Sequence, residues 1–181
     1  VLCNIPFMSV AYAPAGTSLL KACLQEKGFI CTVKDYNIKL WDSLSDKKII
    51  DNLENYFTVN TTLDTDTQVL VDQYYELIVS ELVKLNPKWI GFSVFTFQCQ
   101  RATTEILQRL RSRYKGKIMI GGAGISTRGI ASSNADYAER LIKDNLIDAY
   151  IKGDGDIALV ELLKGNYEYA GINGNPYKGV P

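Results

Sequence analysis

The chain has 181 residues, with 20 basic and 20 acidic side chains and no histidine. This length predicts a single domain with a buried core. The balanced charge and the lack of a basic run argue against a nucleic-acid partner, and no apolar stretch approaches the roughly 20 residues that would span a membrane. Without histidine the chain lacks the commonest general base, zinc ligand and axial ligand, so the sequence favours a binding site over a catalytic one.

Strand-like and helix-like segments alternate along the chain. Apolar runs predict five strands, at residues 1–5, 29–36, 89–95, 117–120 and 149–152. Helical spacing of apolar residues predicts helices at 19–24, 46–57, 70–85, 99–110, 134–146 and 156–164. Thr17 or Ser18 is expected to cap the first helix, and Gly28 is expected to end it.

This alternation predicts an α/β fold with a doubly wound, mainly parallel sheet of five strands. Because βαβ crossovers are right-handed, the simplest strand order is 2-1-3-4-5, which is flavodoxin-like or Rossmann-like. We expect residues 1–165 to form this domain, with 38–66 as an insert, because that stretch exceeds a usual connection. Residues 166–181 are rich in turn formers and are expected to form a hairpin and a linker toward a C-terminal domain.

The four cysteines lie in apolar segments, and their spacing matches no zinc or iron–sulfur pattern; they are Cys3, Cys23, Cys31 and Cys99. Buried, reduced thiols in a cytoplasmic protein are therefore expected. The first five residues form an apolar run with no charged segment before it, so we expect no signal peptide.

Small residues end three of the predicted strands. These ends are Ser93-Val94-Phe95, Gly121-Gly122-Ala123-Gly124 and Gly153-Asp154-Gly155-Asp156. Each has an ordinary structural interpretation: a packed serine, a glycine turn, an aspartate that caps a helix. Ligands of parallel sheets bind at the carboxyl ends of the strands, so three such ends together favour a site for a broad, flat ligand.

The sequence has no nucleotide-binding motif at the position that such a motif requires. A dinucleotide fingerprint would follow the first strand, whereas the only comparable glycine run here follows the fourth, and no P-loop is present. Ser9, Thr17 and Ser18 match the phosphate loop of an FMN flavodoxin weakly. A flavin-binding electron carrier therefore stays as one alternative.

The chain resembles the cobalamin-binding (B12-binding) domain that forms the N-terminal part of some radical SAM enzymes. The resemblance covers nearly the whole chain and rests on residues 14–16, 35–37, 87–93, 121–122 and 148–156. It implies a corrin across the strand ends, with the dimethylbenzimidazole tail inserted along the sheet. The candidate cofactor-binding residues are Pro14, Gly16, Ser93, Phe95, Thr96, Gly121, Gly122, Gly124, Gly153, Asp154 and Gly155.

Two motifs of related proteins are missing. The chain has no DxHxxG segment, so the resemblance implies base-off cobalamin without a protein histidine on the cobalt. It also has no CxxxCxxC segment, so an iron–sulfur cluster and S-adenosylmethionine are expected only in a C-terminal radical SAM domain, the implied partner.

The leading hypothesis is therefore an accessory cobalamin domain of a methyltransferase- or cyclase-type radical SAM enzyme, without catalysis by this fragment alone. Besides the flavin carrier, a scaffold or interaction module that has lost the cofactor stays open.

Overall fold

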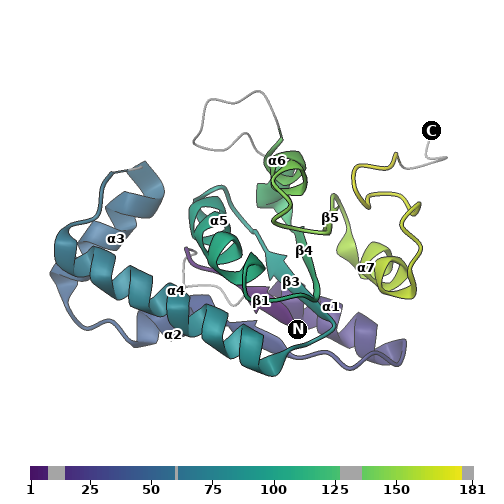
Figure 1. Ribbon diagram of the computed structural model, residues 1–181, viewed down its shortest axis with the longest axis horizontal. Helices are drawn as coiled ribbons and strands as arrows, with labels where there is room; N and C mark the ends of the chain where they lie inside the picture. Colours follow the sequence, from purple (N-terminus) through teal and green to yellow (C-terminus); the bar gives the residue numbers. More distant parts are fainter. Residues whose placement is uncertain (8–14, 60, 127–135, 177–181) are drawn as a thin grey trace.

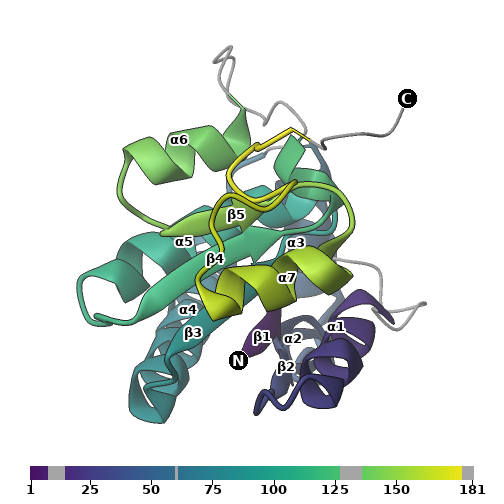
Figure 2. The ribbon, with the colours of Figure 1, turned by 90° about the vertical axis from the view of Figure 1, so that its right-hand side faces the viewer.

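The computed structural model describes residues 1–7, 15–59, 61–126 and 136–176. Five parallel strands form one sheet in the order β2-β1-β3-β4-β5 (Figures 1 and 2). The strands are β1 (Leu2–Asn4), β2 (Val33–Asp35), β3 (Trp89–Ser93), β4 (Lys117–Gly121) and β5 (Ala149–Ile151). The predicted fold class and strand order are confirmed.

Helices cover both faces of this sheet (Figures 1 and 2). They are α1 (Ala15–Glu26), α2 (Tyr36–Asp42), α3 (Lys47–Val59), α4 (Thr65–Leu85), α5 (Gln98–Arg111), the 3₁₀ turn η1 (Ala123–Ser126), α6 (Tyr137–Lys143) and α7 (Gly155–Lys164). Helices α1 and α7 pack against each other on one face, whereas α4 and α5 pack together on the other.

Alternation of side chains along the strands produces two unequal cores. The larger core lies under α4, α5 and α6 and takes the strand residues Cys3, Phe92 and Ile120. The smaller core lies under α1 and α7 and takes Leu2, Met119, Ala149 and Ile151 from the strands. Because both faces are covered, the central strands are apolar almost throughout.

Several predicted boundaries are wrong, and helix caps explain two of the errors. The second strand ends at Asp35, not at residue 36, because the Asp35 side chain accepts a hydrogen bond from the Ile38 amide (2.9 Å) and starts α2. Helix α4 starts at Thr65 for the same reason, with Asp64 accepting from the Thr67 amide (2.9 Å).

The first helix also starts earlier than predicted. Its first residue is Ala15, so Thr17 and Ser18 lie inside the helix and neither is its cap. Gly28 follows the last turn with φ +82°, as predicted for a residue that ends a helix. The third strand ends at Ser93 rather than at residue 95.

The predicted insert, residues 38–66, contains most of α2, all of α3 and the start of α4. Helix α3 packs against α4 and α5 and buries Leu53, Tyr56 and Phe57. The Phe57 ring stacks on Phe7 with centroids 4.7 Å apart. The described part of the insert therefore extends the larger core.

The C-terminal segment adds to the free edge of β5. Ile172 is fully buried and forms an antiparallel bridge with Ile151. The Lys152 amide donates to Gly171 O (2.8 Å), and the Asn173 amide donates to Tyr150 O (2.9 Å). The domain boundary at 165 and the linker remain predictions; residues 177–181 lie outside the described ones.

All four cysteines are free thiols, as predicted, and three of them are buried. Desolvation by burial raises the pKa of the Cys3 thiol to about 12. A thiol of this kind stays protonated and is a poor nucleophile.

Asp148, in the turn before β5, connects this turn to β4 through hydrogen bonds of its carboxylate. Its carboxylate accepts hydrogen bonds from the Ile118 amide (2.8 Å), Arg111 (3.1 Å) and Lys117 (3.1 Å). Desolvation raises the pKa of this carboxyl, but the amide and the two cations outweigh it and hold the pKa below its ordinary value of 3.8. The charged form therefore stabilises the fold.

We expect Asp148→Asn to lower the free energy of unfolding by about 2 kcal/mol at pH 7, the usual scale for a charge-assisted hydrogen bond. Because the folded-state pKa lies below the unfolded one, this contribution is complete above the unfolded pKa and is lost as pH falls through the folded value. Urea unfolding at pH 7 and pH 3 checks this, with Asp144→Asn, an exposed carboxyl, as the control. A difference that did not shrink at pH 3 would contradict it.

Candidate functional site

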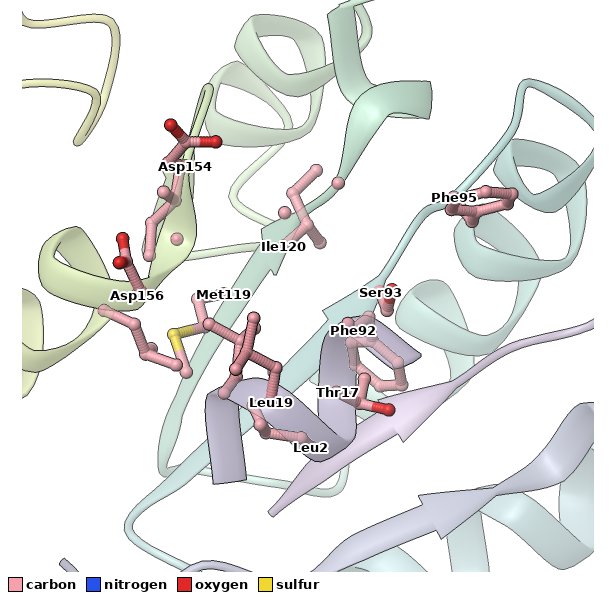
Figure 3. Close-up of a pocket in the computed structure, with 18 of the residues that line it drawn as sticks. Leu2, Thr17, Leu19, Phe92, Ser93, Phe95, Met119, Ile120, Asp154 and Asp156 are labelled. Carbon is pink, nitrogen blue, oxygen red and sulfur yellow. The ribbon is translucent and has the colours of Figure 1, made fainter. Parts of the chain in front are cut away.

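A cavity of about 410 Å³ opens at the carboxyl ends of β3, β4 and β5 and continues between the sheet and helices α1 and α7 (Figure 3). This volume lies within the range of roughly 300–1,000 Å³ that is typical of small-molecule sites. Its lining residues are Leu2, Gly16, Thr17, Leu19, Leu20, Gly91, Phe92, Ser93, Phe95, Met119, Ile120, Gly121, Gly122, Ala123, Ile151, Gly153, Asp154, Gly155, Asp156 and Leu159.

Two glycines open the floor of the cavity. The strand register forms two rows across the sheet, Leu2-Gly91-Met119-Ala149 and, nearer the strand ends, Asn4-Ser93-Gly121-Ile151. All members of both rows face α1 and α7, because side chains two residues apart in a strand share a face. Each row thus has one position without a side chain, and the cavity lies above these two positions.

The surroundings of the two floor glycines differ. A Cβ on Gly91 would lie 2.8 Å from Leu2 Cδ2 and 3.0 Å from Met119 Cε, so neighbouring side chains fill much of the space there. A Cβ on Gly121 would meet only Ile151, at ordinary contact distances of 3.6 and 3.9 Å. Gly121 therefore has open space above it.

The roof of the cavity comes from α1 and α7. Leu19 and Leu20 of α1 and Leu159 of α7 contribute apolar walls. Leu20 Cδ2 lies 3.3 Å from the position that a Cβ on Gly155 would occupy, so this glycine lets α1 approach the start of α7 closely. Leu19 lines the cavity yet is 61% exposed, as expected for an apolar wall beside an open mouth.

Polar groups are few and lie on two sides of the cavity (Figure 3). Ser93 and Thr17 lie on the side of β1 and β3. Thr17 is 2% exposed, and its hydroxyl has no hydrogen-bond partner among the described residues. Asp154 and Asp156 lie on the side of α7. In the part of the chain that the structure describes, no lysine or arginine lines the cavity.

Asp154 does not act as the helix cap that its position suggests. It occupies the N-cap position of α7, but its side chain makes no capping hydrogen bond. Its carboxylate is therefore available to a bound molecule. The carboxylates of Asp154 and Asp156 also offset the partial positive charge at the start of α7, which would otherwise attract a phosphate.

Most predicted site residues come together at this cavity. Those that line it are Gly16, Ser93, Phe95, Gly121, Gly122, Gly153, Asp154 and Gly155. Pro14 lies outside the described residues. Thr96 and Gly124 do not line the cavity.

At Gly122 and at Gly124, an added Cβ would contact backbone atoms rather than open space. A Cβ on Gly124 would lie 2.5 Å from Thr96 O, and the Gly124 amide donates to Val94 O (2.9 Å). Gly122 has φ +104°, and a Cβ there would lie 2.6 Å from Val94 O. Both glycines are therefore required by the close approach of the β3 and β4 ends.

The inner end of the cavity was not predicted. The candidate residues from the sequence do not include the residues that line it, namely Leu2, Leu20, Gly91, Met119 and Leu159. A signal for two of them was present, because Gly91 and Met119 precede Ser93 and Gly121 by two residues and therefore share their face of the sheet.

No group of three histidine, cysteine, aspartate or glutamate side chains that could hold a metal ion occurs among the described residues. Within the same part of the chain, every helix is too short or too polar to cross a membrane. The cavity, with its apolar walls and few polar groups, is therefore suited to binding and orienting a ligand.

Comparisons with known proteins agree with this architecture. No family model and no curated protein matches the chain. Among solved structures, it is similar to the radical S-adenosylmethionine methyltransferase TsrM from Kitasatospora setae with tryptophan substrate and a SAM analogue (20% identity, TM-score 0.55). It is also similar to TsrM with cobalamin and a [4Fe-4S] cluster bound (19%, TM-score 0.56). A third similar structure is the apo form of OxsB, a cobalamin-dependent S-adenosylmethionine radical enzyme (18%, TM-score 0.56).

Each of these similarities covers 94% of this chain but only 27%, 28% and 20% of the respective enzyme. The chain thus has the fold of a minor part of cobalamin-dependent radical SAM enzymes. At this level of identity the shared property is the fold.

Proposed function

We propose that the chain is a cobalamin-binding domain and that it works within a radical SAM enzyme. The observation that carries the proposal is the cavity slot, which opens above Gly121 at the strand ends and continues past Gly91 between the sheet and α1 and α7. A cofactor with a flat ring system and an aromatic tail needs this combination of an open edge and a narrow, apolar slot. The fold shared with cobalamin-dependent enzymes supports the same assignment.

The residues present fit the cofactor. The aromatic tail would be held by apolar contacts with Leu19, Leu20, Met119 and Leu159. The Ser93 hydroxyl would offer the tail one hydrogen bond. At the strand ends the corrin would be bordered by Gly121, Gly153 and Asp154. The Asp154 carboxylate can accept hydrogen bonds from the amide side chains of the corrin. Since the sequence has no histidine, cobalamin would bind base-off without a protein imidazole.

When bound, cobalamin supplies methyl or electron transfer; the chain contributes binding, orientation and exclusion of water. We further propose that an iron–sulfur cluster and S-adenosylmethionine are held by a C-terminal radical SAM domain of the same protein, its partner. A cytoplasmic location and the lack of a nucleic-acid partner stay predictions from the sequence.

Titration of the purified chain with hydroxocobalamin and methylcobalamin tests the proposal. We expect saturable binding, with the shift of the visible spectrum that marks base-off cobalamin. FMN serves as the comparison ligand and is expected not to bind, because the lining residues offer no cation for its phosphate.

Two outcomes would contradict the proposal. Failure of both cobalamins to bind a chain shown folded by circular dichroism would favour a scaffold that lost the cofactor. Saturable binding of FMN alone would favour the flavin carrier instead.

A further inference from the structure

We propose that the cavity selects the lower base of the corrinoid, accepting benzimidazole and rejecting purine bases. This inference rests on the proposed function and concerns the inner end of the same cavity. It predicts which members of the cobamide class the chain binds, a property that the shared fold does not specify.

The inner end of the cavity is apolar on every side that the structure describes. Leu2 and Met119 lie on the floor, Leu20 lies on the α1 side, and Leu159 lies on the α7 side. All four belong to or pack against the smaller core. These four side chains offer a bound group methyl and thioether groups.

The backbone near the inner end is also unavailable as a hydrogen-bond partner. The Gly91 amide donates to Val1 O (2.8 Å), and the Leu2 amide donates to Thr32 O (2.8 Å). Strand β4 lies between β3 and β5, so its backbone around Met119 is engaged on both sides. The described backbone at this depth offers a ligand no hydrogen-bond partner, and the lining carboxylates, Asp154 and Asp156, belong to the start of α7.

The hydroxyls lie to one side of this apolar end. Ser93 belongs to the row nearer the strand ends, two residues beyond Gly91. Figure 3 shows the Thr17 hydroxyl turned away from Met119, toward β1. Among the described lining residues, Ser93 therefore remains as the side-chain hydroxyl that can reach the edge of a base in the slot.

A benzimidazole and a purine have similar shapes but differ in polar groups. The ring nitrogen of a benzimidazole needs one partner, whereas adenine adds an amino group and further ring nitrogens. In the slot these extra groups would lose their water and gain no partner, and together these losses weaken binding by roughly one to two orders of magnitude. We expect adeninylcobamide to bind about 10- to 100-fold more weakly than cobalamin.

The test compares three probes on the 181-residue chain by absorbance titration: cobalamin, adeninylcobamide and cobinamide, which lacks the base. Met119→Gln replaces the thioether with an amide of similar length at the inner end. We expect this variant to narrow the difference between the first two probes at least threefold. Val69→Gln, at an exposed position of α4, is the matched control and should leave the difference unchanged.

The outcomes separate this inference from the proposed function. Equal binding of cobalamin and adeninylcobamide, or binding of cobinamide as tight as that of cobalamin, would overturn the selectivity and leave the cobalamin domain standing. Failure of all three probes to bind would overturn both. Because the first comparison uses the unmodified chain, it does not depend on whether Met119→Gln folds.

Discussion

Replacement of Gly121 by leucine is expected to abolish cobalamin binding while the sheet stays intact. Gly121 lies in the outer row of the cavity floor, and a Cβ there makes only ordinary contacts with Ile151. The backbone therefore tolerates a side chain, but the rest of the leucine must enter the slot. We expect affinity to fall by about 100-fold or more, since an overfilled site costs roughly 1–3 kcal/mol and the tail also loses its contacts.

A graded series at the same position provides the control. Gly121→Ala adds one methyl group and should weaken binding only slightly, whereas Gly121→Leu should remove it. Titration with hydroxocobalamin measures the affinities, and thermal unfolding of the unliganded variants shows whether the fold is kept. Unchanged affinity in a folded Gly121→Leu chain would refute the placement of the tail above this glycine.

Substitution of the neighbouring Gly122 is expected to lower the stability of the fold, whereas substitution of Gly121 is expected to lower ligand affinity. An alanine there must adopt φ +104°, and its Cβ would lie 2.6 Å from the Val94 carbonyl oxygen. Backbone cannot move aside as the end of a flexible side chain can. We expect Gly122→Ala to lower the free energy of unfolding by about 3 kcal/mol, which combines the positive φ with the contact.

Gly28→Ala separates these two causes. Gly28 has φ +82° but nothing within 4 Å of a Cβ, so this variant should cost only about 1 kcal/mol. Urea unfolding of both variants gives the comparison. Equal losses would show that φ alone matters and that the contact with Val94 is relieved without cost.

The topology was predictable because it depends on simple regularities. Five apolar runs alternate with helical spacing, and right-handed crossovers leave 2-1-3-4-5 as the simplest order. The place of the cavity at the carboxyl ends of β3, β4 and β5 followed from the same pattern, because small residues end or follow all three apolar runs.

What the sequence did not predict depends on contacts between distant residues. The four-residue run at 121–124 does not reveal which glycine faces the cavity; the structure places Gly121 over open space and Gly124 against Thr96 O. The starts of α2 and α4 were missed because Asp35 and Asp64 lie in stretches that looked like a strand and a loop. In each case a short aspartate side chain that accepts an amide hydrogen bond decided the boundary.

Because the two cores are unequal, a bound ligand would stabilise one half of the domain more than the other. The larger core, under α4, α5 and α6, is complete without any ligand, whereas the smaller one, under α1 and α7, surrounds the cavity. Apolar groups around a cavity lack part of their packing contacts. An occupant of the slot would supply those contacts and complete the smaller core, so amide hydrogen exchange would slow mainly in α1 and α7. The cofactor would then act as a structural component of one half of the domain and leave the other half unchanged.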